Sequence, residues 1–431
     1  MITHIRMKNF KSWADSGEVK LAPLTGFFGT NSSGKSSLLQ MLLLLKQSAE
    51  HSITEEILFF GDETSPVNLG NLSEVVHGHR QKGSLKLEFG GKLETPISID
   101  YSYPDESGLI KQVSFTTDRF TFDLTIVWNR DVVAVDNIHY LLKSGDDEYK
   151  AQVDINSKKI QGDPLRAKSM NLPKNQLSFE FENLFSHVYY LGPTRVHPQR
   201  LYHWQGTHPK KIDQSGSEAI DAVLSAGVRK LKSSNREDAT LIEDRISEWL
   251  QKMDLAHSFR VIPTSSLDDQ NYEVRLQKSP SSAEVTLADI GYGLADVLPM
   301  LVYCYYVEEG STLILEQPGI HLHPKVQSEL ADFFIEVVDE RKLQILVESH
   351  SEHLLTRLQR RIAEKQIPEE NVALYFCRNN DGASTIEKLE VDGESGDIKN
   401  WPENFFGDVM GDMFAMTDKQ VETIAETEPE G

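Results

Sequence analysis

The chain has 431 residues, of which 39% are hydrophobic and 26% charged, a composition typical of a globular protein too long for one hydrophobic core. Its formal net charge of -22 argues against a broadly basic surface, which is typical of proteins that bind nucleic acid nonspecifically. Two cysteines, Cys304 and Cys377, exclude a disulfide framework and indicate a reducing, cytoplasmic compartment.

The first predicted elements are strands over residues 2–10 and 19–24, and an apolar run over 24–28 leads into a glycine-containing loop. A helix-forming run over 37–46 follows the loop. Its most apolar part, residues 38–45, is far shorter than the roughly 20 residues needed to span a bilayer, so a buried helix is predicted. The N-terminus lacks the apolar region of a secretory signal, and no membrane association is expected.

The loop itself, Gly-Thr-Asn-Ser-Ser-Gly-Lys-Ser, fits the phosphate-binding pattern G-x-x-x-x-G-K-[ST] in its strand–loop–helix setting. Its glycines let several backbone N–H groups point at one anion, and Lys35 can reach the outer phosphates. Ser36 offers a hydroxyl to Mg²⁺. The predicted nucleotide-binding residues are Gly29, Thr30, Asn31, Ser32, Ser33, Gly34, Lys35, Ser36 and Ser37.

From about residue 83 to 181 the pattern changes to the alternation typical of strands, which predicts a β-rich insertion. Residues 189–195 then predict a strand that returns to the core. Apolar residues at helical spacing over 217–255 predict a helical lobe. This lobe is too short for long coiled-coil arms, which need sustained heptads.

Two further apolar strands are predicted, and polar residues end each of them. The first, from residue 312, ends at Glu316, a carboxylate suited to bind Mg²⁺ through water. The second, from residue 343, leads to His350. A strand pair over residues 371–390 is predicted to close the core.

Two glycines lie in the segment over residues 287–300, before the first of these two strands. Gly291 and Gly293 would let backbone N–H groups approach a phosphate, although a plain turn before a helix is an open alternative. His321 and His323 alternate as in some metal sites, but no other ligands are identifiable and a turn is favoured. Gln47 stands about 18 Å along the helix from Lys35, too far to contact the same Mg²⁺.

The order of phosphate loop, acidic strand and strand followed by histidine resembles the ABC-type ATPase head shared by SMC proteins, RecF and OLD-like enzymes. Further segments resemble a prokaryotic ABC/OLD-type ATPase family that ends in a small uncharacterised domain; they are residues 8–12, 191–195, 289–293, 316–318, 321–324, 348–353 and 401–406. The resemblance implies an α/β fold, a P-loop NTPase of the ABC-ATPase head type with a β-rich insertion and a helical lobe. The expected domains are 1–82 and 287–390 for the ATPase core, 83–185 for the insertion, 186–286 for the return strand and helical lobe, and 391–431 for a C-terminal tail.

The resemblance also implies catalytic roles in ATP hydrolysis for Glu316, Gln317 and His350. Glu316 and Ser36 would bind Mg²⁺, and His350 would touch the γ-phosphate. Most ABC heads carry Glu where this chain has Gln317, and an amide orients water without accepting its proton, so slow hydrolysis is expected. Gln317 is interpreted as native, the alternative being a substitution introduced to trap ATP.

Gly291 and Gly293 fall where ABC heads carry their signature motif, which faces ATP on a second subunit. A homodimer or higher homo-oligomer through the heads is therefore expected. The chain also resembles the ATPase subunits of the Septu and PARIS antiviral systems, which implies a cytoplasmic switch that controls a separate effector, a nuclease or toxin, after a phage-derived trigger. A RecF-like genome-maintenance ATPase that binds DNA is the alternative, and a transporter subunit fits less well.

Overall fold

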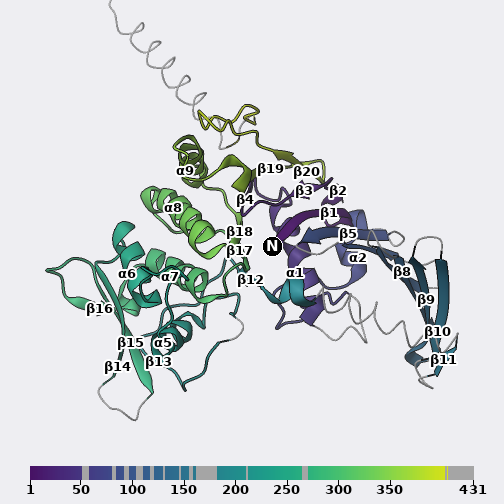
Figure 1. Ribbon diagram of the computed structural model, residues 1–431, viewed down its shortest axis with the longest axis horizontal. Coiled ribbons are helices and arrows are strands. Elements are labelled where there is room, and N and C mark those ends of the chain that lie inside the picture. Colours follow the sequence, from purple (N-terminus) through teal and green to yellow (C-terminus); the bar gives the residue numbers. More distant parts are fainter. Residues whose placement is uncertain are drawn as a thin grey trace, which may run out of the picture.

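The computed structural model describes residues 1–50, 58–79, 84–91, 97–102, 110–116, 121–129, 132–144, 147–154, 159–161, 182–209, 212–264, 270–402 and 405. Their strands form sheets of ten, six and four strands, with helices packed around the six-stranded sheet (Figure 1). The helices of the described residues include none long and apolar enough to cross a membrane.

The six-stranded sheet is the centre of the molecule, and five of its strands are parallel. In spatial order its strands are β12 (Val188–Leu191), β17 (Thr312–Glu316), β18 (Gln344–Glu348), β4 (Leu24–Gly29), β19 (Val372–Asn380) and β20 (Ala383–Lys388). β4, β17 and β18 are buried along their whole length, as expected for parallel strands covered on both faces. The predicted α/β class is confirmed.

Alternate residues of these strands enter two different hydrophobic cores, because successive side chains of a strand point to opposite faces. Leu313 and Leu315 pack into the core formed with α7 (Tyr292–Tyr306), α8 (Pro324–Arg341) and α9 (Glu352–Ala363). Ile314 packs into the core formed with α1 (Lys35–Glu50). Figure 1 shows α8 and α9 on one side of the sheet and α1 on the other.

The N-terminal strands belong to the ten-stranded sheet. β1 spans Ile2–Phe10, as predicted, and pairs antiparallel with β5, so the strands that follow β5 continue the same sheet. The other strands of this sheet are β2 (Trp13–Asp15), β3 (Val19–Lys20), β5 (Ser84–Gly91), β6 (Ile97–Ser102), β7 (Ile110–Thr116), β8 (Thr121–Asn129), β9 (Val132–Ser144), β10 (Asp147–Asp154) and β11 (Lys159–Gln161). The short helices α2 (Leu72–Val75) and η1 (His77–His79) precede β5.

The region predicted as a helical lobe contains helices and a sheet. Its helices are α5 (Ala219–Arg229) and α6 (Ile242–Lys252). A four-stranded sheet, absent from the sequence prediction, accompanies them; its strands are β13 (Tyr202–His203), β14 (Ser258–Pro263), β15 (Asn271–Gln277) and β16 (Glu284–Thr286). The signal for β15 is alternation, since Val274 and Leu276 are buried while the residues between and around them are partly exposed.

The strand pair predicted over residues 371–390 is confirmed. β19 pairs parallel with β4, and β20 forms the antiparallel edge. The one-turn helices η2 (Leu287–Asp289) and η3 (Glu369–Asn371) precede α7 and β19. Of the predicted tail, residues 391–402 and 405 are described, and the ring of Phe405 packs edge-on against Phe376 of β19. Both cysteines are buried and unbonded, as small apolar residues are.

Candidate functional site

The phosphate loop joins β4 to α1 at the carboxyl edge of the central sheet, where ligands bind in open α/β sheets. Two of its glycines cannot be replaced by larger residues without strain. A Cβ on Gly29 would lie 2.1 Å from the Cys377 carbonyl oxygen, and one on Gly34 would lie 2.5 Å from the Ser384 hydroxyl. Both also have positive φ angles, of 136° and 91°.

The loop is supported from the N-terminal sheet as well. The indole N–H of Trp13 donates to the Gly34 carbonyl oxygen at 3.1 Å. Around the loop, Thr30, Asn31 and Ser32 are exposed, while Ser33 and Ser37 are buried. The backbone N–H of Ser37 bonds back to Gly34 and begins α1.

The Lys35 ammonium lies inside the curl of the loop. It donates to the carbonyl oxygens of Gly29 at 3.2 Å and Thr30 at 2.7 Å, and to the Ser33 hydroxyl at 3.3 Å. Burial lowers the pKa of Lys35, although the charge of Glu348 opposes this shift. A buried cation held by neutral groups is suited to bind a phosphate.

Two buried carboxylates face each other beside the loop. Glu316 and Glu348 are the last residues of β17 and β18 and occupy paired positions in the sheet. Burial, together with the charge of Glu348, raises the pKa of Glu316 to about 7. Burial also raises the pKa of Glu348, and its hydrogen bond with Ser36 opposes that change.

Ser36 donates its hydroxyl hydrogen bond to Glu348, not to Glu316, at 3.0 Å. Sequence reasoning assigned Ser36 and Glu316 to the metal and gave Glu348 no role. The signal that could have found Glu348 is its position, since it ends an apolar strand in the same way as Glu316.

The residues present fit a magnesium ion. Glu316 Oε1 is buried and has no hydrogen-bond partner among the described residues, and a carboxylate oxygen left in that state is costly. Mg²⁺ prefers oxygen ligands, and the Ser36 hydroxyl lies in the same cluster. Ser36 and Glu316 would hold the ion between the loop and the sheet.

Three other side chains surround Glu316, and the sequence pattern gave them no role. Arg195 and Lys11 are cations that favour its charged form, and Tyr190 hydrogen-bonds to it. Two nitrogens of Arg195, Nε and Nη1, are buried without a partner in the described part of the chain. Lys11 is held by Gln40 of α1 at 2.5 Å. The two acids of the site are therefore partly neutralised by Arg195 and Lys11 near Glu316 and by Lys35 near Glu348.

Gln317 and His350 follow the two carboxylate-ending strands. Gln317 has a φ of 50°, a left-handed conformation that is uncommon for a residue with a side chain. Its backbone N–H donates to the Glu348 carbonyl oxygen at 2.9 Å. The His350 ring hydrogen-bonds to the Gly29 backbone, and burial together with Lys35 lowers its pKa. Both residues thus lie next to the loop.

Two helix caps fix the turns that carry these residues. Ser351 caps α9 by accepting a hydrogen bond from the Leu354 N–H at 3.0 Å. His323 caps α8 by accepting from the Lys325 N–H, and Pro324 is the first residue of that helix. The turns after Glu316 and His350 therefore end in ordered helices.

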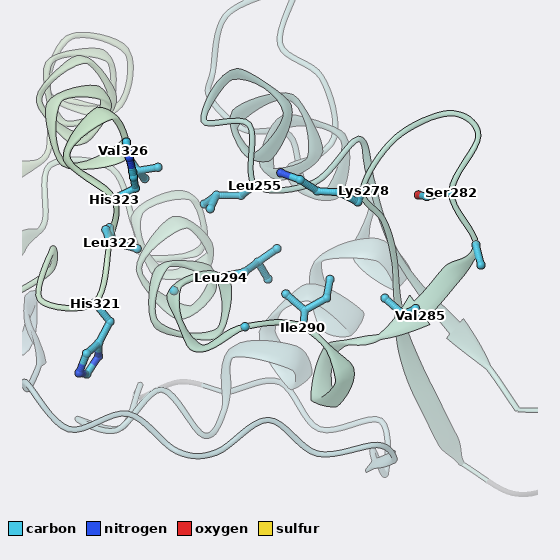
Figure 2. Close-up of a pocket in the computed structure, with 13 residues that line it drawn as sticks. Leu255, Lys278, Ser282, Val285, Ile290, Leu294, His321, Leu322, His323 and Val326 are labelled. Carbon is cyan, nitrogen blue, oxygen red and sulfur yellow. The ribbon is translucent and has the colours of Figure 1, made fainter.

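Gly291 and Gly293 lie away from the phosphate loop. They line a cavity of about 640 Å³ between α7, the β15–β16 turn and the turn before α8, and residues 29–37 do not line it. Figure 2 shows mainly apolar side chains, including Leu255, Leu294 and Val326, around this cavity. Gly291 precedes α7 in an extended conformation and Gly293 lies in its first turn. One chain alone therefore does not bring these glycines to its own loop.

His321 and His323 have different local partners. His321 bonds to Asp296 at 2.6 Å, and Figure 2 shows its ring directed away from Leu294 and Leu255, whereas His323 caps α8. Groups of three or more His, Cys, Asp or Glu side chains suited to a metal are absent from the described residues. The Gln47 amide is bonded to Phe59 and Val67, so it holds the chain after α1.

Comparison with known proteins identifies the family. The AAA ATPase domain family matches residues 1–355, and a family described as a protein of unknown function (DUF3696) matches residues 367–416. No curated protein matches the chain.

Three solved SMC head domains are distantly similar. A head bound to the C-winged helix domain of ScpA is 11% identical, with a TM-score of 0.44 over 90% of this chain and 98% of that one. The head from Thermotoga maritima is 11% identical, with a TM-score of 0.38 over 90% and 99%. A head with an extended coiled coil, bound to the C-terminal domain of ScpA and derived from Pyrococcus furiosus, is 10% identical, with a TM-score of 0.40 over 90% and 96%.

These structural likenesses are too weak to carry an argument about activity or partners. The family match is extensive, since it includes the phosphate loop and both strands that end in a buried carboxylate. The chain therefore belongs to the AAA ATPase domain family.

Proposed function

We propose that this protein is a molecular switch that binds ATP with Mg²⁺ and hydrolyses it slowly. The observation that carries the proposal is the position of Lys35, inside a phosphate loop whose Ser36 hydroxyl contacts one of two facing buried carboxylates. Family membership supports nucleotide binding. ATP hydrolysis, Mg²⁺ binding and the biological role are proposed in addition.

Each residue has a chemical task in this proposal. Lys35 and the loop N–H groups bind the phosphates, and Ser36 with Glu316 holds the metal. The bound ion neutralises charge on the phosphates. Gln317 orients the attacking water without accepting its proton, and His350 lies where the γ-phosphate is expected, because its ring bonds to Gly29.

Two copies are proposed to assemble with ATP between them, each loop facing the partner's Gly291 and Gly293. The support is steric, because a Cβ on Gly291 would meet nothing within 4 Å in the single chain, so another molecule can approach its backbone. A symmetric pair would bury this surface twice.

The proposed biological role is control of a separate effector, a nuclease or toxin, in antiviral defence, triggered by a phage-derived signal in the cytoplasm. This role follows the resemblance to the Septu and PARIS ATPases. A RecF-like repair ATPase is the second candidate, and the net charge of -22 disfavours it, since DNA binding draws on cationic surfaces.

A lysine substitution tests the nucleotide site. Lys35→Ala should weaken ATP binding about a hundredfold, because it removes the charge-assisted contacts to phosphate. Titration with a fluorescent ATP analogue measures the affinity. Lys46→Ala is the matched control, as Lys46 lies on the same helix and pairs only with Glu50 among the described acids. Unchanged binding by Lys35→Ala would contradict the assigned loop.

Co-purification with neighbouring gene products distinguishes the two roles. A nuclease or toxin that is retained or released according to ATP supports the defence role. Hydrolysis stimulated by DNA, without a protein partner, supports the repair role.

A further inference from the structure

Glu348 lies closer to the phosphate-loop strand than Glu316 does in the order of the sheet. β18 is inserted between β17 and β4, so Glu348 pairs with Glu316 on one side and with Phe27 of β4 on the other. Of the two acids, Glu348 is therefore the one on the strand next to the phosphate-loop strand. Chain order alone gives no sign of this, because β17 and β18 both follow β4 by a long interval.

The contacts of Glu348 leave one oxygen free. Its Oε1 accepts the Ser36 hydroxyl hydrogen bond at 3.0 Å, and its Oε2 is buried without a partner at good hydrogen-bond geometry in the described part of the chain, although the Gln317 side chain and Lys35 lie near enough to favour the charged carboxylate. Glu316 occupies the paired position, and its Oε1 is also buried without a hydrogen-bond partner among the described residues. Two facing carboxylates with free buried oxygens repel each other, and a divalent cation bound by both would remove that cost.

The neighbouring amide is the other relevant feature. Gln317 follows Glu316 directly, so β17 and its turn contribute one carboxylate to this site. The Gln317 backbone donates to the Glu348 carbonyl oxygen, which joins the two turns directly.

We propose that Glu348 is a second metal-binding carboxylate of this site, acting with Ser36 and Glu316. The proposal rests on the proposed function as a site for ATP and Mg²⁺. It assigns Glu348 to the metal and leaves the orientation of water to Gln317.

Metal affinity tests the proposal on the full-length chain. Mn²⁺ replaces Mg²⁺ as the probe, and electron paramagnetic resonance measures free Mn²⁺ with the protein saturated by a non-hydrolysable ATP analogue. Glu348→Gln and Glu316→Gln should each weaken Mn²⁺ binding by about tenfold or more. The amide oxygen in Glu348→Gln can still accept the Ser36 bond, so loss of that bond does not explain the result.

The control is Glu243→Gln, an acid in α6 that accepts from the Val261 N–H, far from the loop in the chain. It should leave Mn²⁺ affinity unchanged. Nucleotide affinity in EDTA should be the same in all variants, and thermal melting of metal-free Glu348→Gln should show a cooperative transition, which establishes that the variant is folded.

Three outcomes would overturn the proposal. Wild-type Mn²⁺ affinity in Glu348→Gln, with Glu316→Gln impaired and nucleotide binding intact, would contradict this inference alone. Failure of Glu348→Gln to fold would assign the residue to structure. Absence of nucleotide binding in the wild type would refute the proposed function, and this inference with it.

Discussion

At the scale of single residues, Glu316 is the group whose ionisation most affects the site. Its pKa is about 7 in the folded chain, above the ordinary value of 4.5. Between pH 4.5 and pH 7, Glu316 is therefore mostly protonated in the folded chain and mostly ionised in the unfolded chain. Relative to alkaline pH, protonated Glu316 stabilises the folded chain. This contribution to the free energy of unfolding is fully present below pH 4.5 and is lost as the pH rises through about 7. That gap corresponds to roughly 3 kcal/mol.

Glu316→Gln should therefore remove part of the pH dependence of the metal-free protein. Urea unfolding in EDTA at pH 5 and pH 8 should show the wild type losing roughly 2.5 kcal/mol more than the variant over this interval. The charge of Glu348 acts on Glu316, so the difference reports the titration of Glu316 in the presence of that neighbour. Parallel pH profiles for the two proteins would contradict the raised pKa.

Gln317→Glu should raise the rate of phosphate release by about tenfold or more, because a carboxylate can accept the proton of the attacking water. A coupled phosphate assay under saturating ATP and Mg²⁺ measures it. Gln251→Glu, the same change at an exposed position of α6, is the control and should leave the rate unchanged. An unchanged rate in Gln317→Glu would show that the water is activated elsewhere.

At the scale of elements, the sequence predicted the strands and helices that carry long apolar runs. β1, β4, β17, β18 and α1 are examples, and their buried residues explain the success. Among the strands that were not predicted, β13 has two residues and β16 three, too few for a periodic signal, whereas β15 does alternate and could have been predicted. Glu348 ends an apolar strand, which the sequence shows, but its place beside the phosphate loop depends on the lateral order of strands, which apolar periodicity does not contain.

The helices α8 and α9, which follow the two carboxylate-ending strands, are joined by one acid. Asp332 of α8 accepts hydrogen bonds from Arg357 at 2.6 Å and from Arg361 at 2.6 and 2.9 Å, and its side chain is 9% exposed. Removing Asp332 leaves Arg357 without this buried acid, while Arg361 keeps its ion pair with Glu364. The network therefore fixes one helix against the other.

Asp332→Ala should lower the free energy of unfolding by about 2 kcal/mol or more. Chemical denaturation measures this loss. Asp339→Ala is the control, because Asp339 of the same helix pairs with Arg236 at a side-chain exposure of 66%, and it should cost less than about 1 kcal/mol. Equal losses in the two variants would contradict a special role for Asp332.

At the scale of the whole molecule, the separation between the phosphate loop and the Gly291 turn favours function as an assembly. The cavity beside Gly291 has no lining residue from 29–37, and in the proposed assembly a second chain supplies the phosphate for this turn. The loop environment, by contrast, is complete within one chain. Nucleotide binding and association are therefore separable by mutation.

Gly291→Asp should abolish ATP-dependent association while preserving the fold and the binding of ATP to the monomer. An aspartate is a favourable residue before α7, and its charge would repel a phosphate brought by the partner. Light scattering after size-exclusion chromatography, with and without ATP, measures association. Gly291→Asn keeps the size and cap without the charge; association equal to wild type in Gly291→Asp would contradict the proposed contact.

The lateral position of β4 also has a consequence for biosynthesis. A ribosome delivers β4 and the apolar α1 long before β18 and β19, the two strands that flank β4. Until then the nascent chain carries an unpaired apolar strand, a state that invites aggregation and chaperone capture. A polypeptide released before Val372 would lack β19, which pairs with one side of β4. It would also lack the Cys377 carbonyl group, which lies against Gly29.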